Sequence, residues 1–261
     1  MVEFKRRRLF FDIETSPNVV YTWKAGYKIS IPYDSIIKER AIICVSWKWE
    51  GEKEVHSLTW DKKQNDKKLL TEFVKVLAEA DEIIAHNGDF FDMRWLRGRC
   101  VFHGIEMNPY YTTTDTLKLA RYAFYFNSNR LDYLAKFLGV GSKTPHAGFQ
   151  LWVDVMDKKQ EALDMMVEYC ENDVVILEKV YQKIKNYTNP RTNHAHLRGV
   201  EKFACPDCGT HRVYLNKTRT TASGIVKREM KCKNAKCGRN YTISDRAYVQ
   251  YIKFKAAKKT R

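Results

Sequence analysis

The feature that most constrains this chain is the placement of four acidic residues, each of which belongs to or directly follows an apolar segment. These residues are Asp12, Glu14, Asp92 and Asp173. Folding would bring their carboxylates into a half-buried place, where they repel one another unless a cation is present. Carboxylate oxygens are the ligands that hard divalent cations prefer. The sequence therefore predicts a fold that gathers acids around a metal site.

The first two acids lie in one predicted β-strand. Residues 8–14 are aromatic and branched, and they end at the turn signal Ser16-Pro17. Because side chains alternate along a strand, Asp12 and Glu14 point to the same face, about 6.5 to 7 Å apart. They can share one Mg²⁺ or Mn²⁺ or bracket a pair of such ions. An edge strand with two solvated acids is the alternative, since so short a motif also occurs by chance.

The third acid follows a second predicted strand. Residues 81–87 form a short apolar segment, and a helix begins within residues 90–100. Gly88 is expected to provide the tight turn between them, which places Asp92 in the first helical turn. The helix dipole alone stabilises an acid there by about 0.3 to 1 kcal/mol. This capping role and a role in metal binding are compatible.

The fourth acid shares a helical face with a tyrosine. Residues 158–187 have helical periodicity, and Tyr169 and Asp173 are four positions apart. Such a pair suits a site where the carboxylate binds metal and the hydroxyl holds a water in line for attack. The alternative for Tyr169 is an amphipathic aromatic residue of the core.

Together these segments resemble a known enzyme family over residues 5–187. The order Asp-x-Glu, Asn-Gly-x-x-Phe-Asp and Tyr-x-x-x-Asp is the signature of the DEDDy branch of ribonuclease H-like 3′-to-5′ exonucleases, and it is similar to the exonuclease domain of family B DNA polymerases. Glu168 occupies the position, five before the last aspartate, where the sister branch has a histidine. The resemblance therefore places the chain in the DEDDy branch, which has a tyrosine, rather than in the sister branch.

The resemblance implies a role for each matching residue. Two divalent ions, Mg²⁺ or Mn²⁺, would be held by Asp12, Glu14, Asp92 and Asp173. Tyr169 would position the attacking water, and Thr15 and Asn87 would contact the terminal nucleotide. Asp115 and Asp132 are interpreted as helix caps or as groups that support the ligands, and neither is assigned a metal.

The implied fold is an α/β, ribonuclease H-like mixed five-stranded sheet with flanking helices. The remaining pattern agrees with it, because an antiparallel meander is followed by alternating helices and strands. The further strands are predicted at residues 41–49, 54–59 and 110–114, and the further helices at 67–80, 116–124 and 130–138.

A second group of residues predicts a zinc site near the other end of the chain. Cys205 and Cys208 form a Cys-x2-Cys pair, and Cys232 and Cys237 form a Cys-x4-Cys pair after a gap of 23 residues. A glycine follows each pair and permits a tight turn around a thiolate. This spacing fits a closed, tetrahedral structural Zn²⁺ site, as in a zinc ribbon.

Disulfides are the alternative for these cysteines. The total of seven is odd, and no signal peptide precedes the charged start, so we expect a cytosolic chain that binds metal. Cys44, Cys100 and Cys170 lie in apolar stretches and are interpreted as buried thiols.

Charge divides the chain as clearly as the motifs do. Residues 1–187 have 28 basic and 27 acidic side chains, whereas residues 188–261 have 18 basic and 4 acidic ones. The basic end suits the phosphate backbone of nucleic acid. The aromatic residues of this basic end either offer stacking faces to unpaired bases or form the core of the small ribbon. Residues 253–261 either belong to the folded ribbon domain or form a disordered arm.

We therefore expect three segments: an exonuclease domain at residues 1–187, a linker at 188–202 and a basic zinc-ribbon domain at 203–261. His194 and His196 are interpreted as linker residues. The sequence has no apolar run long enough to span a membrane, which favours a soluble, cytoplasmic protein. The compact design with a fused ribbon suits a prokaryote or a phage-infected host cell.

The expected function is that of a standalone, metal-dependent 3′-to-5′ exonuclease that releases nucleoside monophosphates from nucleic acid, with DNA favoured. The 74 residues after position 187 are too few for a polymerase palm domain. Two alternatives stay open: a nuclease that trims RNA, and a zinc-ribbon adaptor whose exonuclease-like domain is only a scaffold.

Overall fold

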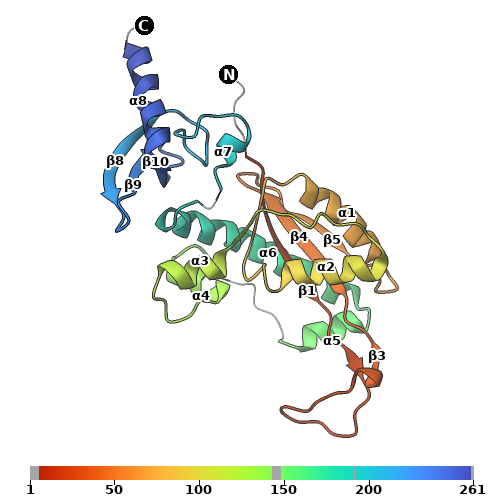
Figure 1. Cartoon of the computed structure of the whole chain (residues 1–261). Coiled ribbons are helices and arrows are strands. Elements are labelled where there is room, and N and C mark those ends of the chain that lie inside the picture. The colour runs from red at the N-terminus through yellow and green to blue at the C-terminus, as the bar shows by residue number, and fades with distance from the viewer. Residues whose placement is uncertain (1–5, 143–147, 191, 260–261) are drawn as a thin grey trace. The chain divides into compact units, whose positions relative to one another are not determined.

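The computed structural model describes residues 6–142, 148–190 and 192–259 (Figure 1). Within these ranges the chain forms two compact units. One unit is Arg7–Tyr181, and the other comprises Arg6 and the described residues from Gln182 onward.

A five-stranded mixed sheet forms the centre of the first unit. Its strands are β1 (Arg8–Thr15), β4 (Ile42–Trp49), β5 (His56–Thr59), β6 (Glu82–Ala85) and β7 (Thr113–Asp115). They lie in the order β5-β4-β1-β6-β7. The pairs β1/β4 and β4/β5 are antiparallel, whereas β1/β6 and β6/β7 are parallel. The predicted mixed five-stranded fold is confirmed, although β5 and β7 are shorter than expected.

Helices cover both faces of this sheet. They are α1 (Lys67–Ala78), α2 (Asp92–His103), α3 (Thr116–Ala123), α4 (Leu131–Phe137), α5 (Gln150–Met156) and α6 (Gln160–Ile184), and α6 continues as the 3₁₀ turn η2 (Lys185–Tyr187). Apolar residues of α1 and α2 pack on one face of β1 and β4, and those of α5 and α6 pack on the other. The sequence analysis did not predict α5.

The alternation of side chains along β1 decides which residues face each layer. Leu9, Phe11 and Ile13 belong to the core beneath α1 and α2. Phe10 points the other way, and its ring lies 5.6 Å from that of Tyr181 on α6. Asp12 and Glu14 share this parity and therefore face the α6 side of the sheet.

An arm that the sequence analysis did not predict leaves the sheet between β1 and β4. The strands β2 (Val19–Val20) and β3 (Ile36–Lys38) pair antiparallel, and a 3₁₀ turn, η1 (Tyr33–Ser35), precedes β3. We call residues 19–38 the arm. Figure 1 shows it as a loop that extends beyond the sheet and helices of its unit.

The second unit is a small antiparallel sheet with one long helix. Its elements are α7 (His194–Leu197), β8 (Val213–Thr220), β9 (Val226–Cys232), β10 (Asn240–Ser244) and α8 (Asp245–Lys259), with strand order β10-β9-β8. Tyr241 and Tyr251 are buried in its core, and their hydroxyls donate to the carbonyls of Phe203 and Val213 at 2.7 and 3.1 Å. These two tyrosines form the ribbon core, which the sequence analysis had weighed against base stacking.

Residues 253–259 belong to α8, so this stretch is helical and the disordered-arm alternative is wrong for it. The last two residues lie outside the described ranges. None of the described helices is both long enough and apolar enough to cross a bilayer.

The segment predicted as a linker contains α7. The side chain of Asn193 caps this short helix and accepts a hydrogen bond from the His196 amide at 3.1 Å. His194 is buried, and Nδ1 of His196 lies 2.9 Å from the carbonyl oxygen of Val200. Within the described residues, neither histidine belongs to a group of potential metal ligands.

Candidate active site and metal centre

The strand β1 presents the first two acids at the edge of the core. Asp12 lies opposite Ser46 and Glu14 opposite Cys44 in the antiparallel pair with β4. The pairing becomes irregular between Glu14 and Thr15, where β1 ends. The regular strand thus fixes both carboxylates on one face just before the chain turns away from the sheet.

The helix α6 brings Asp173 to the same place. One carboxylate oxygen from each of Asp12, Glu14 and Asp173 lies within 4.8 Å of the others. Oxygens that share a cation at about 2.0 to 2.6 Å from it are separated by distances of this size. Asp173 is only 2% exposed, so its charge is held in a largely desolvated position. The spacing of the three acids fits a shared divalent cation.

Asp92 approaches this group from the opposite side of the sheet. It is the first residue of α2 and is 2% exposed. Burial raises the pKa of its carboxyl well above the usual value, and the charges of Asp12 and Glu14 raise it further, whereas hydrogen bonds from the amides of Asp92 and Ile13 oppose the shift. In the described structure its buried Oδ1 has no hydrogen-bond partner. A cation at this oxygen would relieve both the desolvation and the repulsion.

The turn that places Asp92 differs in detail from the prediction. The left-handed residue is Asn87, with φ of 66°, and its amide donates to Oδ1 of Asp115 at 3.0 Å. Gly88 is needed for a different reason, because a Cβ at this position would collide with the Cβ of Ala85. Asparagine tolerates the left-handed region better than most residues, so the pair Asn-Gly serves two separate requirements.

Asp115 and Asp132 have different roles. Asp115 is the N-cap of α3, where its Oδ1 accepts from the Leu117 amide at 2.9 Å as well as from Asn87. It therefore connects α3 to the turn before α2. Asp132 lies in the first turn of α4 and is bonded to Lys136 at 2.9 Å, so it is not a cap.

A cleft of about 840 Å³, which we call the acidic cleft, opens beside the three converging acids, and Asp92 is not among the described residues that line it. Asp12, Glu14 and Asp173 line it together with Asn87 and Phe91. The opposite wall comes from α3 and the connection to α4, and its polar residues are Arg121, Asn127, Ser128, Asn129, Arg130 and Asp132. The sequence analysis missed this wall apart from Asp132. The helical spacing of Leu117 and Arg121, both in the lining, is the one signal that could have indicated it.

Tyr169 and Thr15 lie at the margin of this site. Tyr169 is one helical turn before Asp173 and is 7% exposed. The carbonyl of Thr15 accepts a hydrogen bond from Nε1 of Trp152 at 3.1 Å. Neither is among the described residues that line the acidic cleft. Their assigned contacts with water and nucleotide stay predictions.

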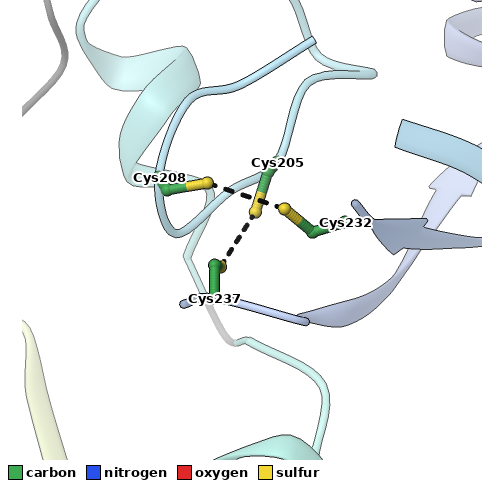
Figure 2. Close-up of side chains that lie close together, drawn as sticks. All are labelled: Cys205, Cys208, Cys232 and Cys237. Atoms are coloured by element: carbon green, nitrogen blue, oxygen red, sulfur yellow. Dashed lines mark hydrogen bonds between the residues drawn. The ribbon is translucent and has the colours of Figure 1, made fainter. Parts of the chain in front are cut away.

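The four cysteines of the second unit point toward one another (Figure 2). The sulfurs of Cys205 and Cys237 are 3.6 Å apart, those of Cys208 and Cys232 are 3.7 Å apart, and all four lie within 4.8 Å. These separations are far longer than the disulfide bond of about 2.05 Å. Four thiolates at about 2.3 Å from a tetrahedral Zn²⁺ are separated by about 3.8 Å. The cluster therefore has the size of a Zn²⁺ site.

Each cysteine pair lies in a tight turn, which we call a knuckle, and both knuckles have the turn geometry that their glycines predict. Gly209 and Gly238 have φ of 66° and 58°, in the left-handed region. The Gly209 amide donates to the carbonyl of Cys205 at 2.9 Å, and the Asn234 amide points to Sγ of Cys232 at 3.4 Å. These turns bring together sulfurs that also belong to, or pack against, the small hydrophobic core.

A buried ion pair supports the first knuckle. Asp207 lies between its two cysteines, and its carboxylate is 3.3 Å from Arg6 and 3.7 Å from Arg239. Arg239 also donates to the carbonyl of Lys185. The sequence analysis missed this network, because nothing in the local sequence around Asp207 identifies partners so distant in the chain.

Comparisons with known proteins agree with this architecture. A family model described as RNase_H superfamily matches residues 38–185. The structure is similar to the family B DNA polymerase from the hyperthermophilic archaeon Pyrobaculum calidifontis, with a TM-score of 0.52 and 15% identity over 70% of this chain. The match covers 25% of that polymerase. A comparison with curated protein sequences gives no match.

Proposed function

Because this chain belongs to the RNase_H superfamily, we propose that it is a metal-dependent nuclease that hydrolyses nucleic acid from the 3′ end. The observation that carries the proposal is the convergence of Asp12, Glu14 and Asp173 within 4.8 Å, beside the buried Asp92. DNA is the favoured substrate, because the signature motifs resemble those of polymerase proofreading domains.

The four acids would hold two Mg²⁺ or Mn²⁺ ions. The unpartnered Oδ1 of Asp92 and the spacing of the other three carboxylates fit such hard cations. Bound ions would activate the attacking water and stabilise charge on the attacking and leaving oxygens. The carboxylates themselves bind and orient, and no lysine or histidine base is needed.

The remaining residues of the site would position the substrate. Tyr169 would hold the water in line with the scissile bond, and Asn87 and Thr15 would contact the terminal nucleotide. Arg121 and Arg130 also line the acidic cleft, so their guanidinium groups would bind backbone phosphates of the strand.

The second unit would add a structural Zn²⁺ and affinity for the nucleic-acid backbone. Cys205, Cys208, Cys232 and Cys237 provide a closed set of ligands with no open position for catalysis. The excess of basic residues after position 187 suits phosphate groups.

The test is a digestion of oligonucleotides that carry a label at the 3′ or the 5′ end. DNA and RNA of the same sequence are incubated with the protein in Mg²⁺, Mn²⁺ or EDTA. We expect a ladder that shortens from the 3′ end, with nucleoside monophosphates as products and no cleavage in EDTA. Asp12→Ala should abolish the ladder. Shortening from the 5′ end, or cleavage in EDTA, contradicts the proposal, and faster digestion of RNA reverses the preference for DNA.

A further inference from the structure

The arm displays an unusual set of exposed aromatic side chains. Trp23, Tyr27, Tyr33 and Tyr21 are 102%, 92%, 88% and 75% exposed. A tyrosine or tryptophan in a folded protein normally packs at least one ring face, because its apolar area contributes strongly to stability. These rings contribute little to the core, so their exposure requires another explanation.

The root of the arm, in contrast, is firmly anchored. The amide of Ser16 donates to the carbonyl of Ala41 at 2.9 Å, and the amide of Ala41 donates to Oγ of Ser16 at 2.8 Å. Asn18 accepts from the amide of Arg40 at 3.0 Å. These bonds close the neck of the arm directly after β1, the strand that carries Asp12 and Glu14. The rings are therefore presented from a fixed base beside the active site.

A groove connects the neck of the arm with the acidic cleft. It lies along α2, and Arg40, Phe91, Arg94, Trp95 and Phe102 are among its lining residues. The Arg40 guanidinium lies 4.7 Å from the ring centre of Trp95. Phe91 lines both this groove and the acidic cleft. The groove therefore meets the acidic cleft at Phe91 and reaches the neck of the arm at Glu39 and Arg40, and most of its lining is aromatic or cationic.

Charge favours one kind of occupant for the arm and this groove. Lys24 and Lys28 alternate with the exposed rings, and the Lys28 ammonium lies 5.5 Å from the Tyr27 ring centre. Aromatic faces interleaved with cations are typical of surfaces that stack unpaired bases and follow the phosphate backbone. The arm also exposes Ile29, Ile31 and Ile37, so a second copy of this chain is the competing occupant, and the test below separates it from a strand.

We propose that the arm is a binding platform for single-stranded nucleic acid, which holds the strand whose 3′ end lies in the acidic cleft. This inference rests on the proposed function, because it assumes that the cleft accepts a strand. The rings of Trp23 and Tyr27 would stack on bases several nucleotides away from the scissile bond. Longer strands should therefore bind more tightly than short ones, and the arm should supply the difference.

The test measures binding by fluorescence anisotropy in EDTA, where no cleavage is expected. Full-length protein is titrated into fluorescein-labelled DNA and RNA strands of 3 and 12 nucleotides. Trp23→Ala/Tyr27→Ala should weaken binding of the 12-mer by about 10- to 100-fold and change binding of the 3-mer less than about threefold. Trp23→Phe/Tyr27→Phe should restore most of the affinity, because phenylalanine keeps a stacking face.

Matched controls separate stacking from other effects. Tyr110 and Tyr122 are 86% and 85% exposed and lie outside the arm, so Tyr110→Ala/Tyr122→Ala should bind both strands like the wild type. The proposal is overturned if the arm variant binds the 12-mer normally, if it loses affinity equally for both lengths, or if the control variant shows the same loss. It is also overturned if the wild type is a dimer and the arm substitutions only make it monomeric, because the arm would then bind a second copy.

Failure of the platform proposal can be distinguished from failure of the proposed nuclease function. A wild-type protein that never cleaves in Mg²⁺, but whose arm variant still loses affinity for the 12-mer, keeps the platform and loses the nuclease assignment. A wild type that digests 3′ ends, with an arm variant that binds normally, gives the opposite result.

Discussion

At the scale of single residues, Asp92 combines a cost to stability with a proposed role in metal binding. Its carboxyl is buried, its pKa is raised by desolvation and by Asp12, and one of its oxygens lacks a hydrogen-bond partner in the described structure. A buried polar atom without a partner costs about 1 to 3 kcal/mol. The metal-free protein is therefore destabilised at the position where a cation would be held.

Asp92→Asn should accordingly stabilise the metal-free protein while removing activity. Asparagine keeps the shape and removes the charge, so we expect a melting temperature several degrees higher in EDTA, from about 1 to 3 kcal/mol. Because the folded-state pKa is raised, the stabilising contribution of Asp92 is present at low pH and lost as the pH rises through that pKa. The gap between variant and wild type should therefore widen with pH.

Thermal melts in EDTA and in Mg²⁺ provide the measurement for Asp92→Asn. Mg²⁺ should raise the melting temperature of the wild type more than that of the variant, because the wild type binds the ion better. Asp132→Asn is the control, since Asp132 is partly exposed and bonded to Lys136. A variant that melts below the wild type in EDTA would show that Asp92 is held by protein contacts alone.

Tyr169 and Asp173 should give distinct kinetic results although they share a helical face. Tyr169→Phe removes only the hydroxyl proposed to orient the water, so kcat should fall by about 10- to 10³-fold with Mg²⁺ and substrate binding nearly intact. Asp173→Ala removes a metal ligand and should abolish cleavage and weaken Mg²⁺ binding. Full activity of the Tyr169→Phe variant would contradict this role and would show that Tyr169 is only an aromatic residue of the core.

At the scale of elements, we expect the second unit to depend on the proposed Zn²⁺ more than on its core. The buried cluster of the second unit is small, and it includes Cys205 and Cys232, with Cys208 and Cys237 packed against it. Domains of this size seldom fold on a hydrophobic core alone. The knuckle turns place the sulfurs at the separation that a tetrahedral ion requires, so metal binding and folding of β8, β9 and β10 should be coupled.

Cys232→Ser/Cys237→Ser should therefore lose the metal and unfold this unit. We expect about one Zn²⁺ per wild-type chain by elemental analysis and almost none in the variant, together with rapid proteolysis after residue 190. Cys100→Ser is the matched control, because Cys100 is a buried thiol in the core of the other unit. Zinc retained in the double variant, or absent from wild-type protein that never met a chelator, would contradict the assignment.

The sequence predicted some elements well because buried elements have a recognisable pattern of apolar residues. α1 and α6 have apolar residues that repeat at helix spacing, whereas β1 and β4 are buried on both faces and appear as nearly continuous apolar runs. α8 also has the helical spacing, at Ala247, Tyr251 and Phe254, but its many lysines obscured it. The arm has no such pattern, since its aromatic residues are exposed and contribute little to the core.

The candidate site shows the same division. The acids and cysteines were identifiable because few residue types perform metal chemistry and because the residues within each motif are closely spaced. The wall of the acidic cleft formed by Asn127, Asn129 and Arg130 was not, because loop residues acquire their position from the packing of α3 and α4 rather than from local sequence. The left-handed φ of Asn87 was missed for a related reason, since the neighbouring glycine was the more obvious choice for it.

At the scale of the whole molecule, charge and chemistry are divided between the two units. The acids of the acidic cleft belong to Arg7–Tyr181, whereas most of the basic excess belongs to the second unit. On α8, the ammonium groups of Lys255 and Lys258 lie 5.1 Å from the ring centres of Tyr251 and Phe254. These lysines are exposed and project from a helix that the ribbon core holds in place, so they can neutralise phosphates.

Neutralising this helix should reduce the salt dependence of nucleic-acid binding in the full-length protein. Each phosphate contact contributes about −0.7 to the slope of log affinity against log salt on single strands, so Lys253→Gln/Lys255→Gln/Lys258→Gln should flatten the slope by up to about 2. The control is Lys62→Gln/Lys63→Gln/Lys67→Gln, three exposed lysines of the other unit that lie at and before the start of α1. Both variants change net charge equally, so a general electrostatic effect would flatten both slopes alike. A slope that becomes flatter only in the α8 variant supports direct phosphate contacts. An unchanged slope in the α8 variant would assign the basic unit to solubility rather than to binding.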